Sequence, residues 1–481
     1  MIHKYSLNGY NIVLDVHSGG VSIVDDAAYR LLDFITPPMS EKCPQEILDK
    51  LTGEFSLEQL NEAYGELYEM YKDGILFSED DYAQFADRMV SSPVKAMCLL
   101  VAQDCQLRCK YCFASTGDYG GHRAMMSFET AKKAIDFLIE KSGKRRNLNL
   151  DFFGGEPLMN WKVVQETVAY AREQEKLHDK HFLFTVTTNG VQLTDDKIEY
   201  MNKEMHNVVL SLDGRKEVND FFRVRADGSG SYDSIVPKFQ KFAKARGNKE
   251  YYVRGTFTNK NLDFADDVFH YYDDLGFDQI SMEPVVTDPS VDYALTEKDI
   301  PAVNAEYERL AKKIIEYRKA GKFFNYFHFM IDLDQGPCAI KRLRGCGCGN
   351  EYVAVSADGD VYPCHQFVGK DEWKMGSVYT PETFDLKMKE YFAKANVYAK
   401  EGCKDCWAKF YCSGGCNANN LEYAGDVLKP FPLSCEFEKK RLECAIMIKA
   451  ALASQGIESG ESDSSCGDCG DECEDGGHKV C

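Results

Sequence analysis

Three cysteines in one short loop have a residue type and a spacing that suit iron–sulfur chemistry. Cys105, Cys109 and Cys112 follow a predicted buried strand at 96–102 with the spacing C-x3-C-x2-C. Three thiolates can hold three irons of a four-iron cluster, and the fourth iron is then open to another ligand. Zinc is the alternative, although structural zinc sites are closed by four ligands. His122 is the one candidate for that fourth ligand within reach in the sequence.

A second, larger group of cysteines lies between residues 338 and 435. Its last part has the pattern C-x2-C-x5-C-x3-C followed by a more distant cysteine. Upstream, Asp358-Gly359 between two β-rich runs predicts a hairpin, which would bring Cys346 near Cys364. Zinc ribbons are the alternative for paired cysteines at such spacings. The group consists of Cys338, Cys346, Cys348, Cys364, Cys403, Cys406, Cys412, Cys416 and Cys435.

The composition supports a binding role for these thiols. The chain has 481 residues, and 19 of them are cysteine. No apolar run approaches the roughly 18 residues of a membrane span, and the first residues lack a signal-peptide core. We therefore expect a cytoplasmic protein with no membrane partner, in which disulfides are rare and grouped thiols bind metal. The net charge of −20 argues against a nucleic-acid partner, which usually needs a basic face.

The chain divides into five predicted parts, recognised by changes in pattern and composition. In the first part, β-rich runs precede helical patterns, and Ser56 with Gln59 forms a capping box for the last helix. Ile75–Phe77 are expected to return to the sheet. The parts are a small N-terminal domain at 1–78, a linker at 79–93, a central domain at 94–325, a cysteine-rich domain at 326–456 and a flexible Cys/Asp/Gly-rich tail at 457–481.

The central domain alternates predicted strands and helices. Six strands with a helix in each gap predict an α/β fold with a parallel sheet and outer helices. Such sheets present their chemistry at the C-terminal ends of the strands. The strands are expected at 96–102, 148–153, 182–187, 208–212, 252–257 and 279–286, and the helices at 127–141, 161–176, 194–204, 234–246 and 263–275.

Four segments at these strand ends resemble motifs of the radical S-adenosylmethionine superfamily. Any one of them could be an ordinary turn, but four in order, each after a strand, are hard to explain by turns. The resemblance covers residues 98–290 and implies a partial (βα)6 barrel. The segments are the loop of Cys105, Cys109 and Cys112, then Gly154-Gly155-Glu156-Pro157, Thr187-Thr188-Asn189-Gly190, and Ser211-Leu212-Asp213-Gly214 with Arg223 after it.

This resemblance implies a cofactor and its contacts. The open iron would chelate the amino and carboxylate groups of S-adenosylmethionine. One electron would then split the sulfonium into methionine and a 5′-deoxyadenosyl radical, a reaction that the cofactor performs and the protein positions and shields. No side chain beyond the cluster ligands receives a catalytic role. The implied cofactor-binding residues are Gly154, Gly155, Glu156, Pro157, Thr188, Asn189, Ser211, Asp213 and Arg223.

Residues 326–456 resemble the SPASM domain, the two-cluster extension of peptide- and protein-modifying radical enzymes. The resemblance implies three [4Fe–4S] clusters in all, one that cleaves the cofactor and two auxiliary ones. Cys338 and Cys348 compete for the fourth place in the first auxiliary cluster, and an open iron there is a third possibility. The implied ligands are Cys346, Cys364 and Cys416 for the first auxiliary cluster, and Cys403, Cys406, Cys412 and Cys435 for the second.

The N-terminal domain resembles the winged-helix recognition domain of enzymes that modify ribosomal peptides, with a plain structural cap as the alternative. Such domains bind a leader peptide as an extra strand. The whole chain, including its opening residues 4–12, resembles the maturases of six-cysteine SCIFF peptides. This likeness implies thioether bridges from cysteine sulfur to an α-carbon of a ribosomally made, cysteine-rich precursor peptide. It also implies an external one-electron donor of the flavodoxin or ferredoxin type.

Other functions on the same scaffold remain open. The alternatives are oxidation of a cysteine or serine, as in sulfatase maturation, epimerisation, and formation of C–C cross-links. A non-enzymatic iron–sulfur redox sensor is a further alternative, but a sensor needs no pocket of the kind predicted at 154–157 and 211–214. The sequence names neither the acceptor residue nor the ring pattern.

Overall fold

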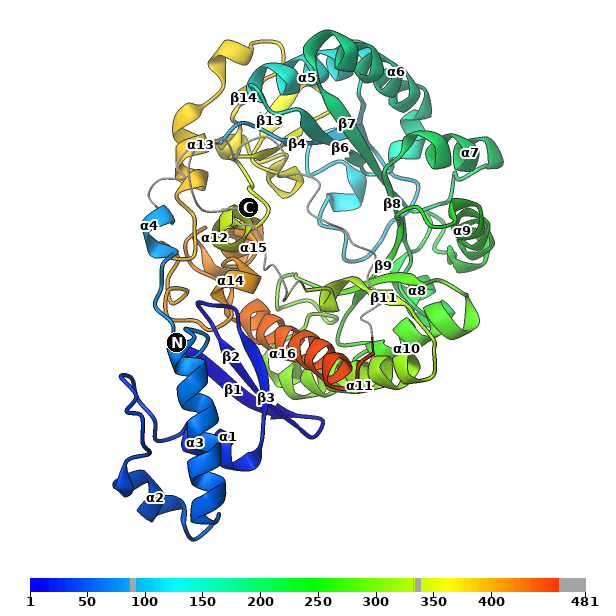
Figure 1. Ribbon diagram of the computed structural model, residues 1–481. Helices are drawn as coiled ribbons and strands as arrows, with labels where there is room; N and C mark the ends of the chain where they lie inside the picture. The colour runs from blue at the N-terminus through cyan, green and yellow to red at the C-terminus, as the bar shows by residue number, and fades with distance from the viewer. Residues whose placement is uncertain (87–91, 332, 334–338, 458–481) are drawn as a thin grey trace.

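A three-stranded antiparallel sheet opens the chain and carries three helices. The computed structural model describes residues 1–86, 92–331, 333 and 339–457, and Figure 1 shows this N-terminal unit in blue beside the rest of the molecule. Buried Val13, Leu31 and Leu60 belong to a core of the unit's own. Its elements are β1 (Ile2–Leu7), β2 (Tyr10–Asp15), β3 (Val21–Val24), α1 (Asp26–Leu31), α2 (Gln45–Leu51) and α3 (Leu57–Lys72).

Local signals placed most of this unit correctly. The Ser56 hydroxyl accepts a hydrogen bond from the Gln59 amide at 3.2 Å, and the Gln59 side chain accepts one from the Ser56 amide at 3.0 Å, so the capping box is confirmed. The expected return of Ile75–Phe77 to the sheet is wrong. Phe77 has a φ of 57°, which interrupts an extended backbone. Strand β1 is the third strand of this sheet and pairs with β2.

The central domain is a curved parallel sheet, as predicted. Six strands follow one another in the order β10-β9-β8-β7-β6-β4, and each pair is parallel. A short strand, β11 (Asn325–Tyr326), extends the sheet beyond β10, and β5 (Ala124–Met125) pairs antiparallel with β4. The six strands are β4 (Ala96–Gln103), β6 (Asn147–Gly154), β7 (His181–Thr188), β8 (Asn207–Ser211), β9 (Tyr252–Phe257) and β10 (Gln279–Pro284).

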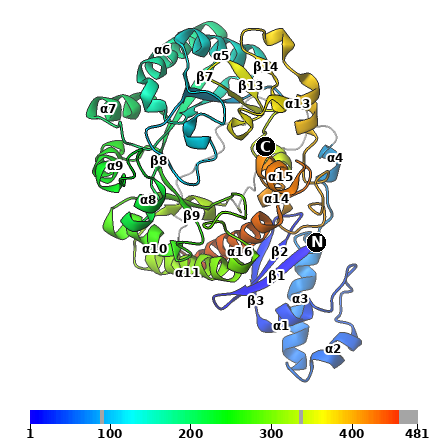
Figure 2. The same cartoon turned by 180° about the vertical axis from the view of Figure 1, so that it is seen from behind.

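Helices cover the outer face of this sheet (Figures 1 and 2). Every second residue of β6 and β7 is buried, as at Leu150 and Phe184, whereas the residues between them are half-buried. Because strand side chains alternate between faces, the half-buried set faces the barrel interior. The helices are α5 (Phe128–Lys141), α6 (Trp161–His178), α7 (Asp195–Glu204), α8 (Lys216–Phe222), α9 (Tyr232–Arg246), α10 (Phe264–Phe269), continued by a π-helical turn at His270–Asp274, and α11 (Ile300–Lys319).

The cysteine-rich region continues the same sheet. The predicted hairpin is confirmed as β12 (Tyr352–Val355) and β13 (Asp360–Tyr362), which pair antiparallel, with β14 (Gly376–Ser377) beside them. Strand β12 also runs parallel to β4, with Ala354 opposite Cys98. The hairpin therefore extends the barrel on the side of the first cysteine loop, and it brings the later cysteines to that side.

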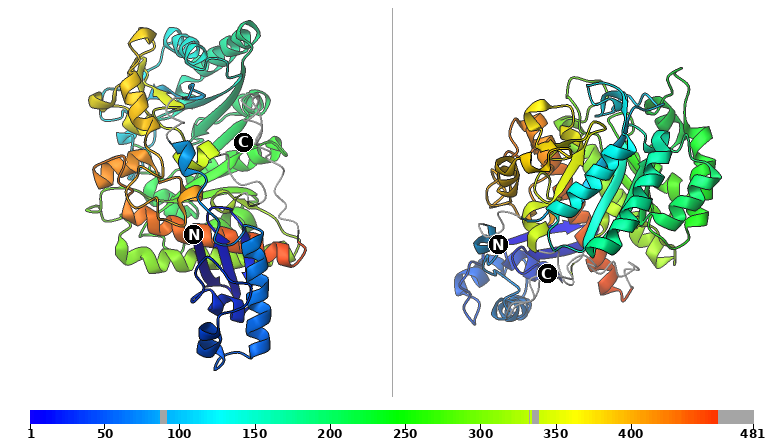
Figure 3. Two further views of the ribbon diagram at one scale, coloured as in Figure 1. Left: turned by 60° about the vertical axis from the view of Figure 1, so that its left-hand side comes forward. Right: turned by 90° about the horizontal axis from the view of Figure 1, so that it is seen from above.

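Short helices and one long helix complete the chain. Helix α16 packs on α11 and against the N-terminal sheet, where the Tyr5 hydroxyl donates to the Glu443 carbonyl at 2.8 Å. The N-terminal sheet thus lies between α3 and α16 (Figure 3). These helices are α4 (Ala83–Ala86), α12 (Ala339–Arg344), α13 (Leu386–Ala393), α14 (Lys409–Cys412), α15 (Asn417–Ala424) and α16 (Pro432–Ser454).

Two sequence predictions cannot be followed in the structure. Cys338 and nearly all of the tail predicted at 457–481 lie outside the described residues. Among the residues that are described, no helix combines the length and apolar character needed to cross a bilayer.

Candidate active site

The first cysteine loop lies at the C-terminal end of β4. The Leu107 amide donates to the Cys105 sulfur at 3.3 Å, and the Asn189 side-chain amide donates to it at 3.4 Å. Burial raises the pKa of the Cys105 thiol to about 12 and that of Cys109 to about 11. Iron binding must therefore displace their protons, and the sulfur of Cys105 already has two donors that stabilise a thiolate.

The predicted zinc alternative does not fit this loop. His122 is largely exposed and pairs with Asp358 at 3.2 Å, in the turn between β12 and β13. Within the part of the chain that the structure describes, no three His, Cys, Asp or Glu side chains converge as ligands of a single metal ion. A four-iron cluster binds its cysteines through separate irons, so this arrangement fits a cluster better than zinc.

Gly154 and Gly155 bring the end of β6 against the cysteine loop. A Cβ on Gly154, whose φ is 137°, would lie 2.2 Å from the Ala102 carbonyl oxygen, and a Cβ on Gly155 would lie 2.3 Å from that of Asp104. The Gly155 amide donates to the Ala102 carbonyl at 2.7 Å. Only glycine permits this approach, which places the backbone before Pro157 beside the start of the cysteine loop.

Glu156 is used inside the protein. Its carboxylate accepts hydrogen bonds from the amides of Leu158 (3.0 Å) and Asn189 (2.8 Å) and from the Thr188 hydroxyl (2.7 Å). Burial raises its pKa to about 6, although these bonds oppose the rise. A carboxylate has about four acceptor positions, and three of those of Glu156, which is 1% exposed, are occupied by these donors. Its main effect is to tie the end of β6 to the end of β7.

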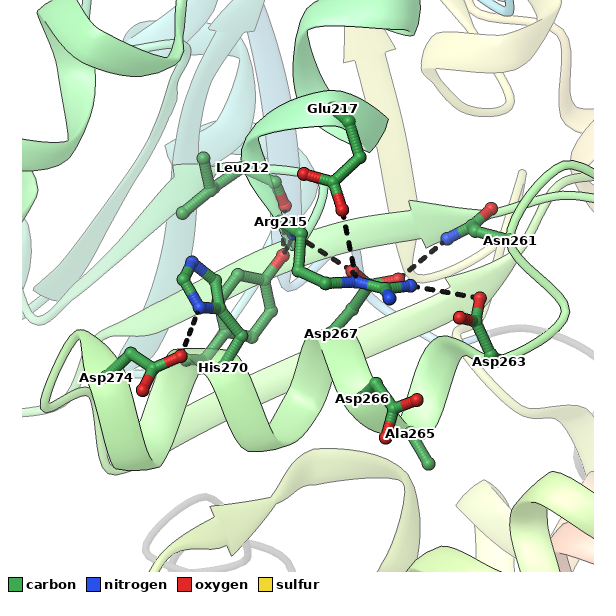
Figure 4. Close-up of polar contacts among 12 residues, drawn as sticks. Leu212, Arg215, Glu217, Asn261, Asp263, Ala265, Asp266, Asp267, His270 and Asp274 are labelled. Carbon is green, nitrogen blue, oxygen red and sulfur yellow. Dashed lines mark hydrogen bonds and ion pairs between the residues drawn. The ribbon is translucent and has the colours of Figure 1, made fainter.

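Hydrogen bonds to α10 and to the π-helical turn after it hold the loop that follows β8, as Figure 4 shows for Arg215 and Asp267. The Gly214 amide donates to the Tyr271 hydroxyl, which donates to the Leu212 carbonyl, both at 2.5 Å. Arg215 donates to one Asp267 oxygen from its backbone amide (2.9 Å) and its Nε (2.8 Å). A Cβ on Gly214 would lie 2.3 Å from the Asp267 carboxyl group. These contacts tie the predicted cofactor loop to α10 and to the π-helical turn after it.

Asp213 and Arg223 form a buried ion pair beside the cysteine loop. The Arg223 Nε lies 3.0 Å from Asp213 Oδ1, the Thr256 amide donates to the same oxygen, and Tyr111 donates to the other one. Asp213 is fully buried, so it supports Arg223 and does not itself face a ligand. The buried Gln106 Oε1 makes no hydrogen bond within the described residues. This unpaired acceptor fits a polar cofactor at this position.

The structure brings four cysteines together as the first auxiliary set. Cys348 forms a hydrogen bond with Cys364 and lies in electrostatic contact with Cys346 and Cys416. This hydrogen bond lowers the pKa of Cys364 despite its burial. Of the two competitors for the fourth place, Cys348 is thus grouped with the other three predicted ligands. Cys338 lies outside the described residues.

Four further cysteines form the second auxiliary set. Cys403 is in electrostatic contact with Cys406 and Cys435, and Cys412 with Cys435. The Cys406 amide donates to the Cys403 carbonyl at 3.1 Å, which closes a tight turn. Cys435 comes from the first turn of α16, far away in the sequence. The predicted ligands of this set are therefore neighbours, and the described cysteines are all free thiols.

A buried tyrosine and a histidine separate the first loop from the first auxiliary set. The Tyr119 phenol interacts electrostatically with Cys105 and Cys112 of the loop and with Cys364 of the first auxiliary set. Tyr119 and Cys364 also belong to the same hydrophobic core cluster. His365, next to Cys364 in sequence, faces the loop, with its ring centroid 5.4 Å from that of Phe113. Burial lowers the pKa of His365 to about 4, so the ring is neutral near pH 7. Sequence reasoning missed both residues, whose only signal is proximity to ligands.

The barrel interior also holds a charged pair that sequence reasoning missed. Arg254 of β9 and Glu283 of β10 form an ion pair. Burial favours the neutral acid, but Arg254 outweighs it and lowers the pKa of Glu283 to about 2. The sequence did contain a signal for this pair. Polar residues recur at alternate positions of β9 and β10, and alternate positions of a strand share one face of the sheet.

Comparisons with known proteins agree with this site. A family profile described as a 4Fe-4S single cluster domain matches residues 95–235, and one described as an iron-sulfur cluster-binding domain (SPASM) matches 346–407. The cysteine-type anaerobic sulfatase-maturating enzyme of Clostridium novyi is 26% identical over 68% of this chain and 89% of its own length. The radical SAM cyclopropyl synthase of Paramaledivibacter caminithermalis is 27% identical over 55% of this chain and 58% of its own.

Solved structures share the fold. Native anSMEcpe with bound AdoMet matches with a TM-score of 0.63 at 20% identity, over 76% of this chain and all of that one. Streptococcus suis SuiB bound to precursor peptide SuiA matches with a TM-score of 0.50 at 14% identity, over 88% of this chain and 95% of that one.

Proposed function

This chain belongs to the radical S-adenosylmethionine enzymes with a SPASM domain, and from this premise we propose that it installs thioether bridges in a cysteine-rich precursor peptide. It is a protein-modifying enzyme that uses S-adenosylmethionine and [4Fe–4S] clusters. The proposed reaction joins a cysteine sulfur of the peptide to the α-carbon of another residue.

One observation carries this proposal. The first auxiliary set and the first cysteine loop meet at one hydrophobic core cluster, because Tyr119, Cys348 and Cys364 belong to that cluster and Cys112 packs against it. A peptide in the barrel opening can thus present a carbon to one site and a thiol to the other. Such a two-sided position suits a reaction between two peptide residues.

The chain's own residues would hold and shield the cofactor. The backbone at Gly154–Pro157 and the half-buried Ser211 and Arg223 supply polar contacts, whereas Glu156 and Asp213 keep those contacts in position. When bound, the cofactor supplies a hydrogen-abstracting radical, and the auxiliary clusters supply an acceptor for one electron. In net terms, one C–H and one S–H bond of the peptide break and one C–S bond forms, with release of a hydrogen atom, a proton and an electron.

The N-terminal domain is proposed to bind the leader of the peptide. Strand β3 lies at the edge of its sheet, where the order is β1-β2-β3. Ile23 on that strand is 38% exposed, and Ile75, which packs beside Gly20 just before β3, is 41% exposed. An edge strand with exposed apolar side chains suits the addition of a peptide strand. The structure of Streptococcus suis SuiB with its precursor peptide lends support.

Anaerobic reconstitution with a candidate peptide tests the function. The protein, S-adenosylmethionine and a reductant, or a flavodoxin-like donor, are incubated with a cysteine-rich peptide that carries its leader. We expect 5′-deoxyadenosine and a peptide that has lost two hydrogen atoms per bridge and has fewer alkylatable thiols. A peptide that loses its sulfur and gains an aldehyde would instead favour oxidation of a cysteine, the second candidate, which the 26% identity to the Clostridium novyi enzyme supports.

A further inference from the structure

Lys400 is a buried cation of the cysteine-rich region, with 2% of its surface exposed. Its Nζ donates to the Gly414 carbonyl at 2.8 Å and to Asn417 Oδ1 at 2.7 Å, and it lies 3.4 Å from the Gly415 carbonyl. All three partners are acceptors, which matches the three protons of an ammonium group. Three neutral acceptors therefore surround the Lys400 ammonium group.

The surroundings of Lys400 are built around its side chain. Gly414 has a φ of 80°, and a Cβ there would lie 2.5 Å from the Lys400 Cδ. Gly414 and Gly415 lie between Cys412 of the second auxiliary set and Cys416 of the first. The loop that separates the two sets thus wraps around this one lysine.

Lys400 lies close to cysteines of both auxiliary sets. Its carbonyl accepts from the Cys403 amide at 3.2 Å, and its Nζ bonds the Gly414–Gly415 segment between Cys412 and Cys416. Its ammonium group also interacts electrostatically with Cys403, Cys412, Cys346 and Cys416. Within the described residues, no carboxylate forms an ion pair with it. Lys409, a second buried lysine nearby, differs in this respect, because its Nζ is paired with Asp80 at 2.8 Å.

We propose that Lys400 is a positioning residue for electron flow, one that raises the reduction potentials of both auxiliary clusters. Uptake of one electron adds one negative charge to a cluster, and a nearby positive charge in a low-dielectric interior favours that reduced state. One lysine between both sets makes each of them a better electron acceptor. This inference rests on the proposed function, from which it takes the cysteine ligands of the two auxiliary clusters.

A redox titration monitored by electron paramagnetic resonance tests the proposal on the full-length, reconstituted protein. Lys400→Gln removes the charge but keeps an amide that can donate to the carbonyls, and Lys400→Met removes both. We expect the midpoint potentials of both auxiliary clusters to become more negative in either variant, with the cofactor-cleaving cluster unchanged. Lys400→Arg should restore the wild-type values. Lys409→Gln, which removes a charge that Asp80 already balances, should not shift both clusters together.

The iron content separates the possible failures. Wild-type protein that binds zinc, or fewer than two auxiliary clusters, would contradict the ligand assignment itself. Unchanged midpoints in Lys400→Gln at full iron content would overturn the role of Lys400. Loss of auxiliary iron in both neutral variants would also overturn it, because Lys400 would then be needed to build the sites.

Discussion

The Arg223 guanidinium lies 3.0 Å from the Asp213 carboxylate, and both groups interact electrostatically with the Cys109 thiol. Because removal of one partner leaves a buried charge without compensation, Asp213→Asn should cost about 3–5 kcal/mol of stability. It should also weaken S-adenosylmethionine binding, since Arg223 loses its support. Thermal unfolding and cofactor titration measure the two effects. Asp220→Asn on the neighbouring α8 is the control, and equal loss of cofactor affinity in both variants would contradict a specific role for Asp213.

Cys109→Ala should abolish cofactor cleavage, because it removes one of three ligands of the cleaving cluster. Three clusters hold about twelve irons, so about eight should remain in the variant. Iron and sulfide analysis with an assay for 5′-deoxyadenosine measures both numbers. Cleavage at the wild-type rate would refute the assignment of this loop.

Cys348→Ala should remove or destabilise the first auxiliary cluster, because Cys348 bonds Cys364 and interacts electrostatically with Cys346 and Cys416. Its iron content should fall by up to about four per chain. The matched variant is Cys338→Ala, the other candidate ligand, which should keep its iron. The reverse result would make Cys338 the fourth ligand, and full iron in both variants would indicate an open iron.

Ile23→Asp should raise the KM for the precursor peptide about tenfold or more, because a charge on an edge strand opposes the addition of another strand. Cofactor cleavage without peptide should not change. Leu177→Asp, at an exposed apolar position on α6, is the control. Deletion of residues 1–78 is a poorer test, because Leu7 and Ile12 belong to the main core. An unchanged KM in Ile23→Asp would favour the alternative that the N-terminal domain is only a structural cap.

Asp15 should make the stability of the N-terminal domain sensitive to acid. Burial alone would raise its pKa, but hydrogen bonds from Ser78 and Ser18 lower it overall. The stabilisation is therefore full above the unfolded pKa of about 3.9 and is lost as the pH falls through the lower folded value. Asp15→Asn should cost about 2 kcal/mol at pH 7.

Thermal unfolding of the wild type and Asp15→Asn between pH 7 and pH 3 checks this dependence. The difference in Tm between the two proteins should shrink only below about pH 4. A difference that stays constant down to pH 3 would show that the Asp15 charge is not the cause.

The sequence by itself determined the elements and most of the chemistry. The alternation of apolar runs defined the six central strands within a few residues, because a parallel sheet needs continuous buried strands. The motif spacing placed Cys105, Cys109 and Cys112 after β4, and the capping signal at Ser56 depends on neighbours three residues apart. All of these are local properties, which the order of residues is enough to specify.

The tertiary structure alone decided how distant segments meet. Only the parallel pairing of β12 with β4 brings the first auxiliary set beside the first loop. Only the packing of the chain puts Cys348 next to Cys416, and Lys400 between two sets of thiols. It also showed that Glu156 and Asp213 hold other residues in place. Contacts of this kind depend on the joint packing of many side chains, which no short pattern in the sequence records.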